Sequence, residues 1–196
     1  MAQPESYPAR LEVDYPEQLN RLTTLLRVIW IIPILVILAI LSGGEEGIAI
    51  GLAVATALMI VVRQRYPRWW FDFSRELARF EGRVIAYLAL LTDQYPSTVE
   101  EQSVHIEIDY PDVEQDLNRW LPLVKWLLAI PHFIVLIVLA LLAVIAVIVA
   151  WFAILITGRY PRGLFDFVVG VLRWALRVNA YAFLLVTDRY PPFRLS

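Results

Sequence analysis

The sequence contains the same unusual word twice, and this duplication constrains the fold more than any other feature. RYPRWWFDF at residues 65–73 returns as RYPRGLFDF at residues 159–167, with seven of nine letters matching. Other words repeat at similar spacing: LEVDYP with IEIDYP, LNR with LNR, and AYLALLTDQYP with AYAFLLVTDRYP. Self-similarity at one period indicates a duplicated structural unit. We therefore predict two tandem modules, residues 1–98 and 99–196.

Each module contains a long apolar segment that predicts burial in a membrane. The chain is 59% hydrophobic and only 18% charged. No charged residue occurs in 28–41 or 48–62, and none except His132 interrupts 127–157. Uncharged runs of this length favour membrane insertion over a soluble core. We expect a multi-pass protein of the cell membrane.

The apolar segments predict a helical hairpin in each module, at residues 19–63 and 117–158. SGGEEG at residues 42–47 separates two helices in the first module, whereas the second has no such loop. At 1.5 Å per residue, 127–156 would reach about 45 Å as one helix, too long for one straight span and short for two. A full hairpin, a re-entrant hairpin and one long span therefore remain open for the second module.

A short strand precedes each hairpin, at residues 10–15 and 104–110. Apolar and polar residues alternate in both segments, which is the period of a half-buried strand. Because a lone strand is not stable, we expect the two strands to pair with each other or with a second copy. The fold class is then an all-α membrane protein with a small β element.

After each hairpin we predict an interfacial amphipathic helix, at residues 74–92 and 168–187. Arg75, Arg79 and Arg83 recur every four residues and form one helical stripe, and Arg173 and Arg177 repeat it. Arginine at mid-span costs about 2.5–3.5 kcal/mol per residue, so the flat interface is favoured. We expect Asp72 and Asp166 to cap these helices or to pair with Arg68 and Arg162.

The arginines predict both the orientation and the binding surface. They flank the ends of each apolar segment, so by the positive-inside rule both termini face the cytoplasm. Anionic lipid headgroups attract each nearby base by about 1 kcal/mol. The candidates for headgroup contact are Arg65, Arg68, Arg79, Arg83, Arg159, Arg162, Arg173 and Arg177.

Residues of catalytic type are scarce, and we expect neither a metal nor another cofactor. Cysteine is absent, and His105 and His132 have no counterpart in the first module. Pro33 and Pro131 do recur inside the first helices, where they indicate a kink. The arginines lie against the predicted bilayer and the net charge is -2, which argues against nucleic acid as a partner.

Several words of the second module resemble a bacterial membrane-protein family, domain of unknown function 4389. They are DYP, WLPLVKWLLAIPH, RYPRGLFDF and LRVNAYAFLLVTDRYPPF. The first module is similar but looser, with Trp69-Trp70 in place of Gly-Leu and Ile34 in place of His. The resemblance spans nearly the whole chain. It implies a multi-pass membrane protein and assigns no activity and no site residue, so any family role of His132 would belong to the second module alone.

The function that we predict is a non-enzymatic scaffold or adaptor at the cytoplasmic leaflet that contacts anionic lipids. A small transporter or channel subunit is the alternative, suggested by the duplicated hairpins and their prolines. A lipid-modifying enzyme using Asp72 and Asp166 is the second alternative. The expected partners are membrane lipids and either another protein or a second copy of the chain.

Overall fold

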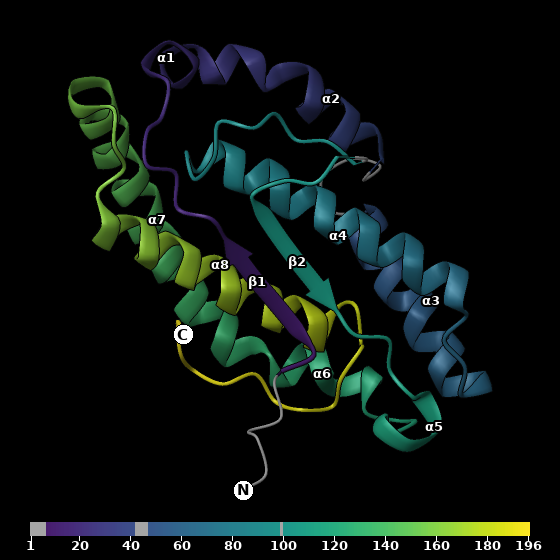
Figure 1. Ribbon diagram of the computed structural model, residues 1–196. Coiled ribbons are helices and arrows are strands. Elements are labelled where there is room, and N and C mark those ends of the chain that lie inside the picture. The colour runs from purple at the N-terminus through teal and green to yellow at the C-terminus, as the bar shows by residue number, and fades with distance from the viewer. Residues whose placement is uncertain (1–6, 42–46, 99) are drawn as a thin grey trace, which may run out of the picture.

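The computed structural model describes residues 7–41, 47–98 and 100–196, and it is built as two interlocked halves (Figure 1). The first half contains β1 (Ala9–Val13), α1 (Arg21–Trp30), α2 (Ile32–Leu41), α3 (Gly47–Arg63) and α4 (Arg68–Leu88). The second half contains β2 (Val104–Ile108), α5 (Val113–Asp116), α6 (Pro122–Leu128), α7 (Ile130–Thr157) and α8 (Arg162–Ala182).

The two strands pair with each other, as one of the two sequence interpretations predicted. They are antiparallel, and Leu11 lies opposite Ile106 in the centre of the register. Both of these side chains are buried, whereas Glu12 and Glu107 alternate with them and are exposed. The strand pair therefore has one face on the core and one polar face in solvent.

The halves interlock because each strand packs on the last helix of the other module. β1 lies on α8, and β2 lies on α4. Gly82 of α4 makes the second contact possible, since a Cβ there would stand 2.2 Å from Cδ1 of Ile106. Each module thus supplies the cover for the other module's strand.

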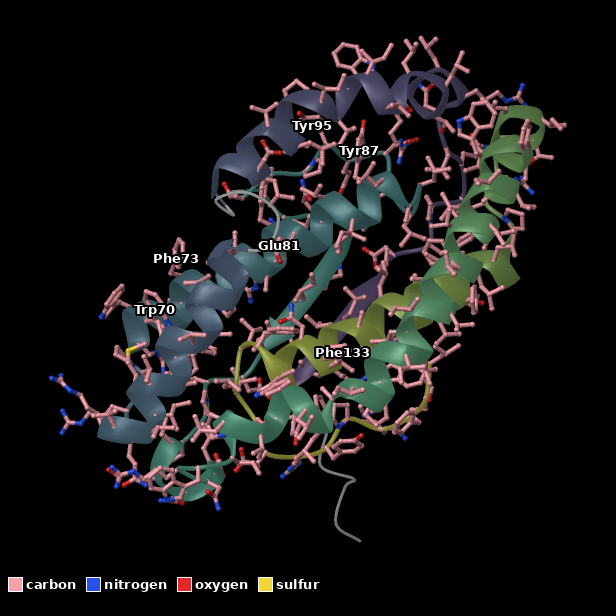
Figure 2. All side chains as sticks on the ribbon, turned by 180° about the vertical axis from the view of Figure 1, so that it is seen from behind. Trp70, Phe73, Glu81, Tyr87, Tyr95 and Phe133 are labelled. Atoms are coloured by element: carbon pink, nitrogen blue, oxygen red, sulfur yellow. The ribbon has the colours of Figure 1, made fainter. Side chains whose placement is uncertain are left out.

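The helices form two layers behind the strand pair. Figure 1 shows the strands in front of α4 and α8, and Figure 2, from behind, shows α3 and α7 nearest to the viewer. The helix pair α7 and α8 is in close contact, with Trp174, Val178 and Tyr181 of α8 buried in the same cluster as Ala129. The α3/α7 side and the strand pair are therefore opposite faces of the molecule.

The hairpin predicted for residues 117–158 is wrong, because α7 is a single helix of 28 residues. Residues 132–157 contain no glycine and no proline, so nothing in that segment breaks the helix. Of the three open alternatives, one long helix is what the structure has. The turn predicted at residues 42–47 of the first module falls almost entirely outside the described residues.

Both recurring prolines lie just after a break between two helices. Ile31 separates α1 from α2 two residues before Pro33, and Ala129 separates α6 from α7 two residues before Pro131. A proline lacks the N–H that would continue the helical hydrogen bonds, which explains a break at these positions. Where the sequence predicted a kink, the structure thus has an interruption between two helices.

The last helix of each module begins six residues earlier than predicted, at Arg68 and Arg162 instead of residues 74 and 168. Each helix follows a Tyr-Pro pair whose proline is the N-cap residue in extended conformation. Proline fits here because the first helical N–H groups need no intrahelical acceptor. The tryptophans and phenylalanines of the repeated word are therefore inside the helix and not ahead of it, whereas its tyrosine precedes the helix.

Candidate functional site

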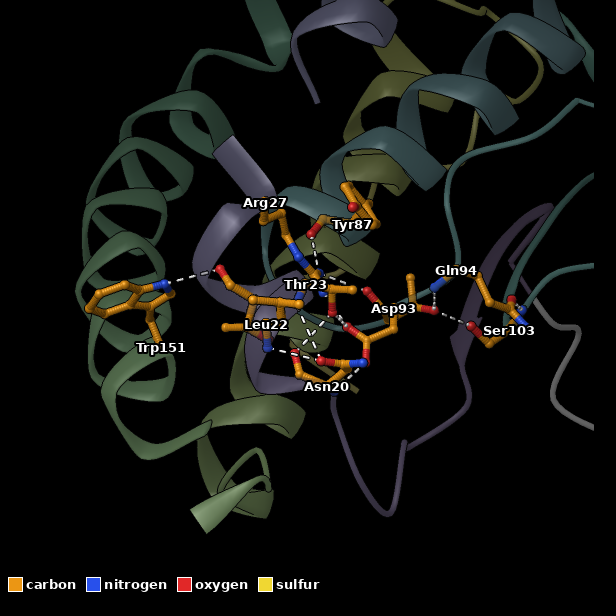
Figure 3. A network of polar contacts seen from close by, with 11 residues as sticks. Asn20, Leu22, Thr23, Arg27, Tyr87, Asp93, Gln94, Ser103 and Trp151 are labelled. Atoms are coloured by element: carbon orange, nitrogen blue, oxygen red, sulfur yellow. Dashed lines mark hydrogen bonds and ion pairs between the residues drawn. The ribbon is translucent and has the colours of Figure 1, made fainter. Parts of the chain in front are cut away.

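A buried ion pair ties the start of the first module to its end (Figure 3). Arg27 of α1 is only 2% exposed. Its Nη1 donates to the carbonyls of Tyr87 (2.6 Å) and Thr92 (2.7 Å), and its Nη2 pairs with Asp93. The guanidinium also stacks over the Tyr87 ring at 4.3 Å. This set of contacts satisfies most of a charge that could not otherwise be buried.

The second module contains the same pair with lysine in place of arginine. Lys125 of α6 is fully buried, and its Nζ contacts the carbonyl of Thr187 and a carboxylate oxygen of Asp188, both at 2.7 Å. It lies 5.2 Å from the centre of the Tyr181 ring. Burial lowers the pKa of Lys125, and the neighbouring Asp188 carboxylate opposes that shift.

Local structure explains how each aspartate reaches its base. After α4 and α8 the chain turns sharply at Leu90 and Leu185, which both have positive φ (62° and 57°). Such a left-handed residue ends many helices, although glycine is the usual choice. The turn directs the following Thr-Asp pair back toward the helix. Asp93 also accepts the backbone N–H of Asn20, and Asp188 accepts that of Asn118.

The sequence interpretation missed both ion pairs. It used Arg27 and Lys125, as basic residues beside the apolar segments, only to predict orientation, and it paired neither of them with an aspartate. The repeated Thr-Asp at 92–93 and 187–188, with a base at the same place in each module, was the available signal.

The repeated word forms a pocket for a tyrosine of the other module. Tyr15, which follows β1, donates its hydroxyl to the carbonyl of Tyr160 at 2.5 Å, and Arg162 stacks on its ring at 3.9 Å. Phe165 meets the same ring edge-on at 5.0 Å. In the mirror arrangement Tyr110 lies against Tyr66, Arg68 and Phe71. Each RYPR…F word therefore binds the DYP word of its partner module.

Most of the eight arginines proposed for lipid contact are engaged within the protein. Arg79 donates to the carbonyl of Ile106 on β2, and Arg173 donates to the carbonyl of Leu11 on β1. Carbonyls of Ser97 and Ser196 accept from Arg83 and Arg177, while Arg68 and Arg162 stack on tyrosines. The remaining two, Arg65 and Arg159, are exposed, and no hydrogen bond or ion pair of their guanidinium groups is found among the described residues.

The capping role predicted for Asp72 and Asp166 is wrong. Because the N-caps are Pro67 and Pro161, both aspartates lie in the second turn of their helices. Asp72 pairs with Arg75, three residues later, at 3.3 Å. It does not pair with Arg68, which was the alternative.

Neither histidine belongs to a metal centre within the described ranges, where no group of three potential metal ligands is found. His105 lies on the exposed face of β2, 3.2 Å from Asp14. His132 is buried, accepts the indole N–H of Trp174 at 3.1 Å and stacks on Phe193 at 4.0 Å. Its position indicates a packing role at the start of α7.

The outer surface of α7 is apolar and uncovered. Within the described residues α7 is the one helix that is long and apolar enough to cross a membrane. Only 11% of its most apolar 18-residue window is buried, so α7 is not the core helix of a water-soluble domain. Its exposed side chains include Ile134, Ile137, Leu141, Ile145, Ile148 and Phe152.

The comparisons with known proteins agree with this duplicated architecture. The sequence matches the family described as domain of unknown function (DUF4389) twice, over residues 21–100 and 120–194. The chain belongs to this family. The resemblance noted from the sequence is thus confirmed, and the two matches confirm the tandem repeat. No curated protein and no solved structure matches the chain.

The first DUF4389 match begins with α1 and the second begins just before α6, and both run past the Thr-Asp turn of their module. Each match therefore contains one complete ion pair, Arg27 with Asp93 or Lys125 with Asp188. β1 and the segment 101–119, which contains β2, lie outside the matches. In this DUF4389 chain the buried pairs are internal to a family unit, whereas the strands and their tyrosines join the two units.

Proposed function

We propose that this protein is a non-enzymatic scaffold seated in the cytoplasmic leaflet of a membrane, where it contacts anionic lipids. The observation that carries the proposal is the uncovered apolar side of α7. A continuous apolar surface of this kind is rare on soluble proteins and marks a membrane or protein contact. Three exposed tryptophans fit the headgroup level of such a seat: Trp30 on α1, Trp120 just before α6 and Trp126 on α6.

The packing of α7 favours insertion of one face of the molecule into the leaflet over an α7 that crosses the bilayer. α8 lies against α7, and the strand pair lies on α8. If α7 crossed the bilayer upright, the exposed charges of Glu12 and Glu107 would be carried into or close to the acyl layer. Buried charges of this kind cost several kcal/mol each. We therefore infer that the α3/α7 face enters the leaflet and that the strand pair stays in water, which replaces the multi-pass expectation.

The two candidate arginines whose guanidinium groups make no hydrogen bond or ion pair among the described residues, Arg65 and Arg159, are placed to meet headgroups. Arg65 follows the end of α3, and Arg159 follows the end of α7, the two helices of the apolar face. Lysine and arginine beside the apolar segments also favour insertion from the cytoplasmic side. Both termini would then be cytoplasmic as well. Each base near an anionic surface contributes about 1 kcal/mol of attraction.

The test is binding of the purified protein to vesicles with and without an acidic lipid. Arg65→Gln combined with Arg159→Gln should lower affinity for acidic vesicles by roughly 30-fold, as expected for about 2 kcal/mol. Affinity for neutral vesicles should not change. Arg10→Gln is the matched control, because Arg10 lies on the exposed face of β1 and pairs with Glu107 and Asp109. If the double variant and the control bind acidic vesicles equally, the lipid assignment fails, and the apolar face would instead be a surface for a protein partner or a second copy.

A further inference from the structure

Two adjoining hollows lie between α4 and α8, on the seam between the modules. One has a volume of about 120 Å³ and is lined from both helices and by Leu11 and Ile106 of the strand pair. The other, of about 50 Å³, is closed by Leu52 and Thr56 of α3. Glu81 and Asn179 line both hollows. We call the two hollows together the Glu81 cavity. Figure 2 shows Glu81 on α4 near the middle of the molecule.

The two polar residues break the internal symmetry. With the spacing of 94 residues that relates Arg79 to Arg173, the counterpart of Glu81 is Ala175 and the counterpart of Asn179 is Ile85. A structural requirement of the duplicated seam would be expected in both copies. The acid and the amide are instead unique, and the fold brings them to the same cavity from opposite modules.

The lining of the Glu81 cavity is mostly apolar, and its few polar groups are mainly hydrogen-bond acceptors. The hydroxyls of Thr56, Ser74 and Tyr66 already donate to the carbonyls of Leu52, Trp70 and Leu184, so toward the cavity they can only accept. Thr56 Oγ1 already accepts one hydrogen bond, from the indole N–H of Trp70 at 2.8 Å. Burial raises the pKa of Tyr66 to about 12, which keeps its hydroxyl protonated. The Glu81 carboxylate and the Asn179 side-chain oxygen add further acceptors, and the Asn179 amide nitrogen is the one donor group of this set.

The cavity lining also supplies no positive charge. Glu81 is the one charged residue on its walls, and its carboxylate has no hydrogen bond or ion pair within the part of the chain that the structure describes. Arg79 and Arg83, its nearest basic neighbours along α4, donate to Ile106 and Ser97. Burial raises the pKa of Glu81, as expected for a carboxyl without a counter-charge.

We propose that the Glu81 cavity binds a primary ammonium group, with Glu81 as counter-ion and the surrounding oxygens as acceptors. An ammonium brings three donors and no acceptor, which complements the acceptor oxygens of the polar part of the lining. The combined volume suits a small amine, and the same chemistry could come from a free amine or from an aminated lipid headgroup. This site is independent of the proposed lipid scaffold.

The test measures binding of [13C]methylammonium to the full-length protein by NMR, with tetramethylammonium and sodium as competitors at equal ionic strength. Tetramethylammonium has the charge but no N–H donor. We expect saturable methylammonium binding that neither competitor displaces. Competition by either one at a similar concentration would overturn the ammonium assignment, because the cavity would then respond to charge alone.

Two variants connect the signal to the cavity. Glu81→Gln keeps the shape of the side chain and should weaken binding by about tenfold or more, the range for a hydrogen bond to a charged group. Asn179→Ile introduces the residue that the first module has at this position and should also weaken it. Glu114→Gln, on exposed α5, is the control and should bind as the parent does. Unchanged binding in Glu81→Gln would refute the site.

A final arm separates the two sources of the amine. Vesicles containing ethanolamine headgroups should displace methylammonium if the lipid is the source, whereas choline vesicles should not. Displacement by both vesicle types would contradict the proposal. Displacement by neither, with methylammonium still bound, assigns the site to a free amine.

Discussion

The Tyr15 hydroxyl donates to the carbonyl of Tyr160, which lies 145 residues further along the chain in the other module. Tyr110 makes the equivalent bond to Tyr66 in the opposite direction. These two contacts, with the arginines stacked on both rings, fix each strand to the other module's helix. The repeated word therefore serves to join the duplicated halves.

Removing either tyrosine hydroxyl should weaken the contact between the two modules. Tyr15→Phe and Tyr110→Phe should each lower the free energy of unfolding by about 0.5–1.5 kcal/mol, the net contribution of one hydrogen bond. Because both bonds join the same pair of modules, we expect effects of similar size. Chemical unfolding in detergent micelles measures them. Tyr95→Phe is the control, since Tyr95 is 45% exposed, and an equal loss there would contradict the account.

Removing one partner of a buried ion pair should cost more than this. Asp93→Asn and Asp188→Asn should each destabilise the fold by about 3–5 kcal/mol, because a buried base is left without its counter-charge. Arg10→Gln breaks exposed ion pairs and should cost about 1 kcal/mol or less. Thermal unfolding of the three variants in parallel tests this order, and equal losses would show that burial does not matter here.

The buried base of each module can also be replaced by the base of the other module. Arg27→Lys should be destabilising, because a single ammonium cannot reach Tyr87, Thr92 and Asp93 with the same fork of donors. Lys125→Arg must fit a larger group into a fully buried site and should also destabilise. If either exchange leaves the unfolding temperature unchanged, the pairs are less closely packed than the structure indicates.

Glu81 predicts a pH dependence of stability. Its folded pKa is raised above the ordinary value of 4.5, so between the two values the folded state holds more protons than the unfolded state. The free energy of unfolding should therefore fall as pH rises from 4.5 through the folded pKa. Glu81→Gln should remove this part of the slope in an unfolding series from pH 4 to 8. A slope identical in the parent and the variant would exclude Glu81 as its source.

The seat along one face predicts that both ends of α7 are on the same side of the membrane. The chain has no cysteine, so single cysteines can be introduced at Trp120, close before α6, and at Arg159, just after α7. An impermeant maleimide added to intact cells should label neither position, because the proposed seat is in the cytoplasmic leaflet, and labelling of both would contradict that side. Labelling of one position alone would mean that α7 crosses the bilayer.

The sequence predicted the parts of this fold that follow from local pattern. Alternation in 104–110 identified β2, the two prolines identified the breaks, and the repeat identified the modules. Beyond the pairing of the two strands, the packing partners of the elements could not be predicted, since periodicity does not show that β1 packs on α8 of the other module. Arg79 and Arg173 illustrate this, because their stripe looked suited to lipid yet bonds the strands.

Part of the missed site did leave a trace in the sequence. Thr-Asp recurs at 92–93 and 187–188, and the bases at 27 and 125 occupy the same place in each module. Glu81 and Asn179 left none, because they are unpaired in the repeat and meet only through the fold. Symmetric features were therefore accessible to sequence reasoning, while the asymmetric cavity was not.

The most direct test of the proposed seat is spin-label accessibility in lipid bilayers. Nitroxides at Ile145 on α7 and at Glu107 on β2 would report on the opposite faces of the molecule. The proposed seat predicts that Ile145 is accessible to oxygen and shielded from a water-soluble nickel reagent, and that Glu107 shows the reverse. Equal access of the nickel reagent to both positions would contradict it.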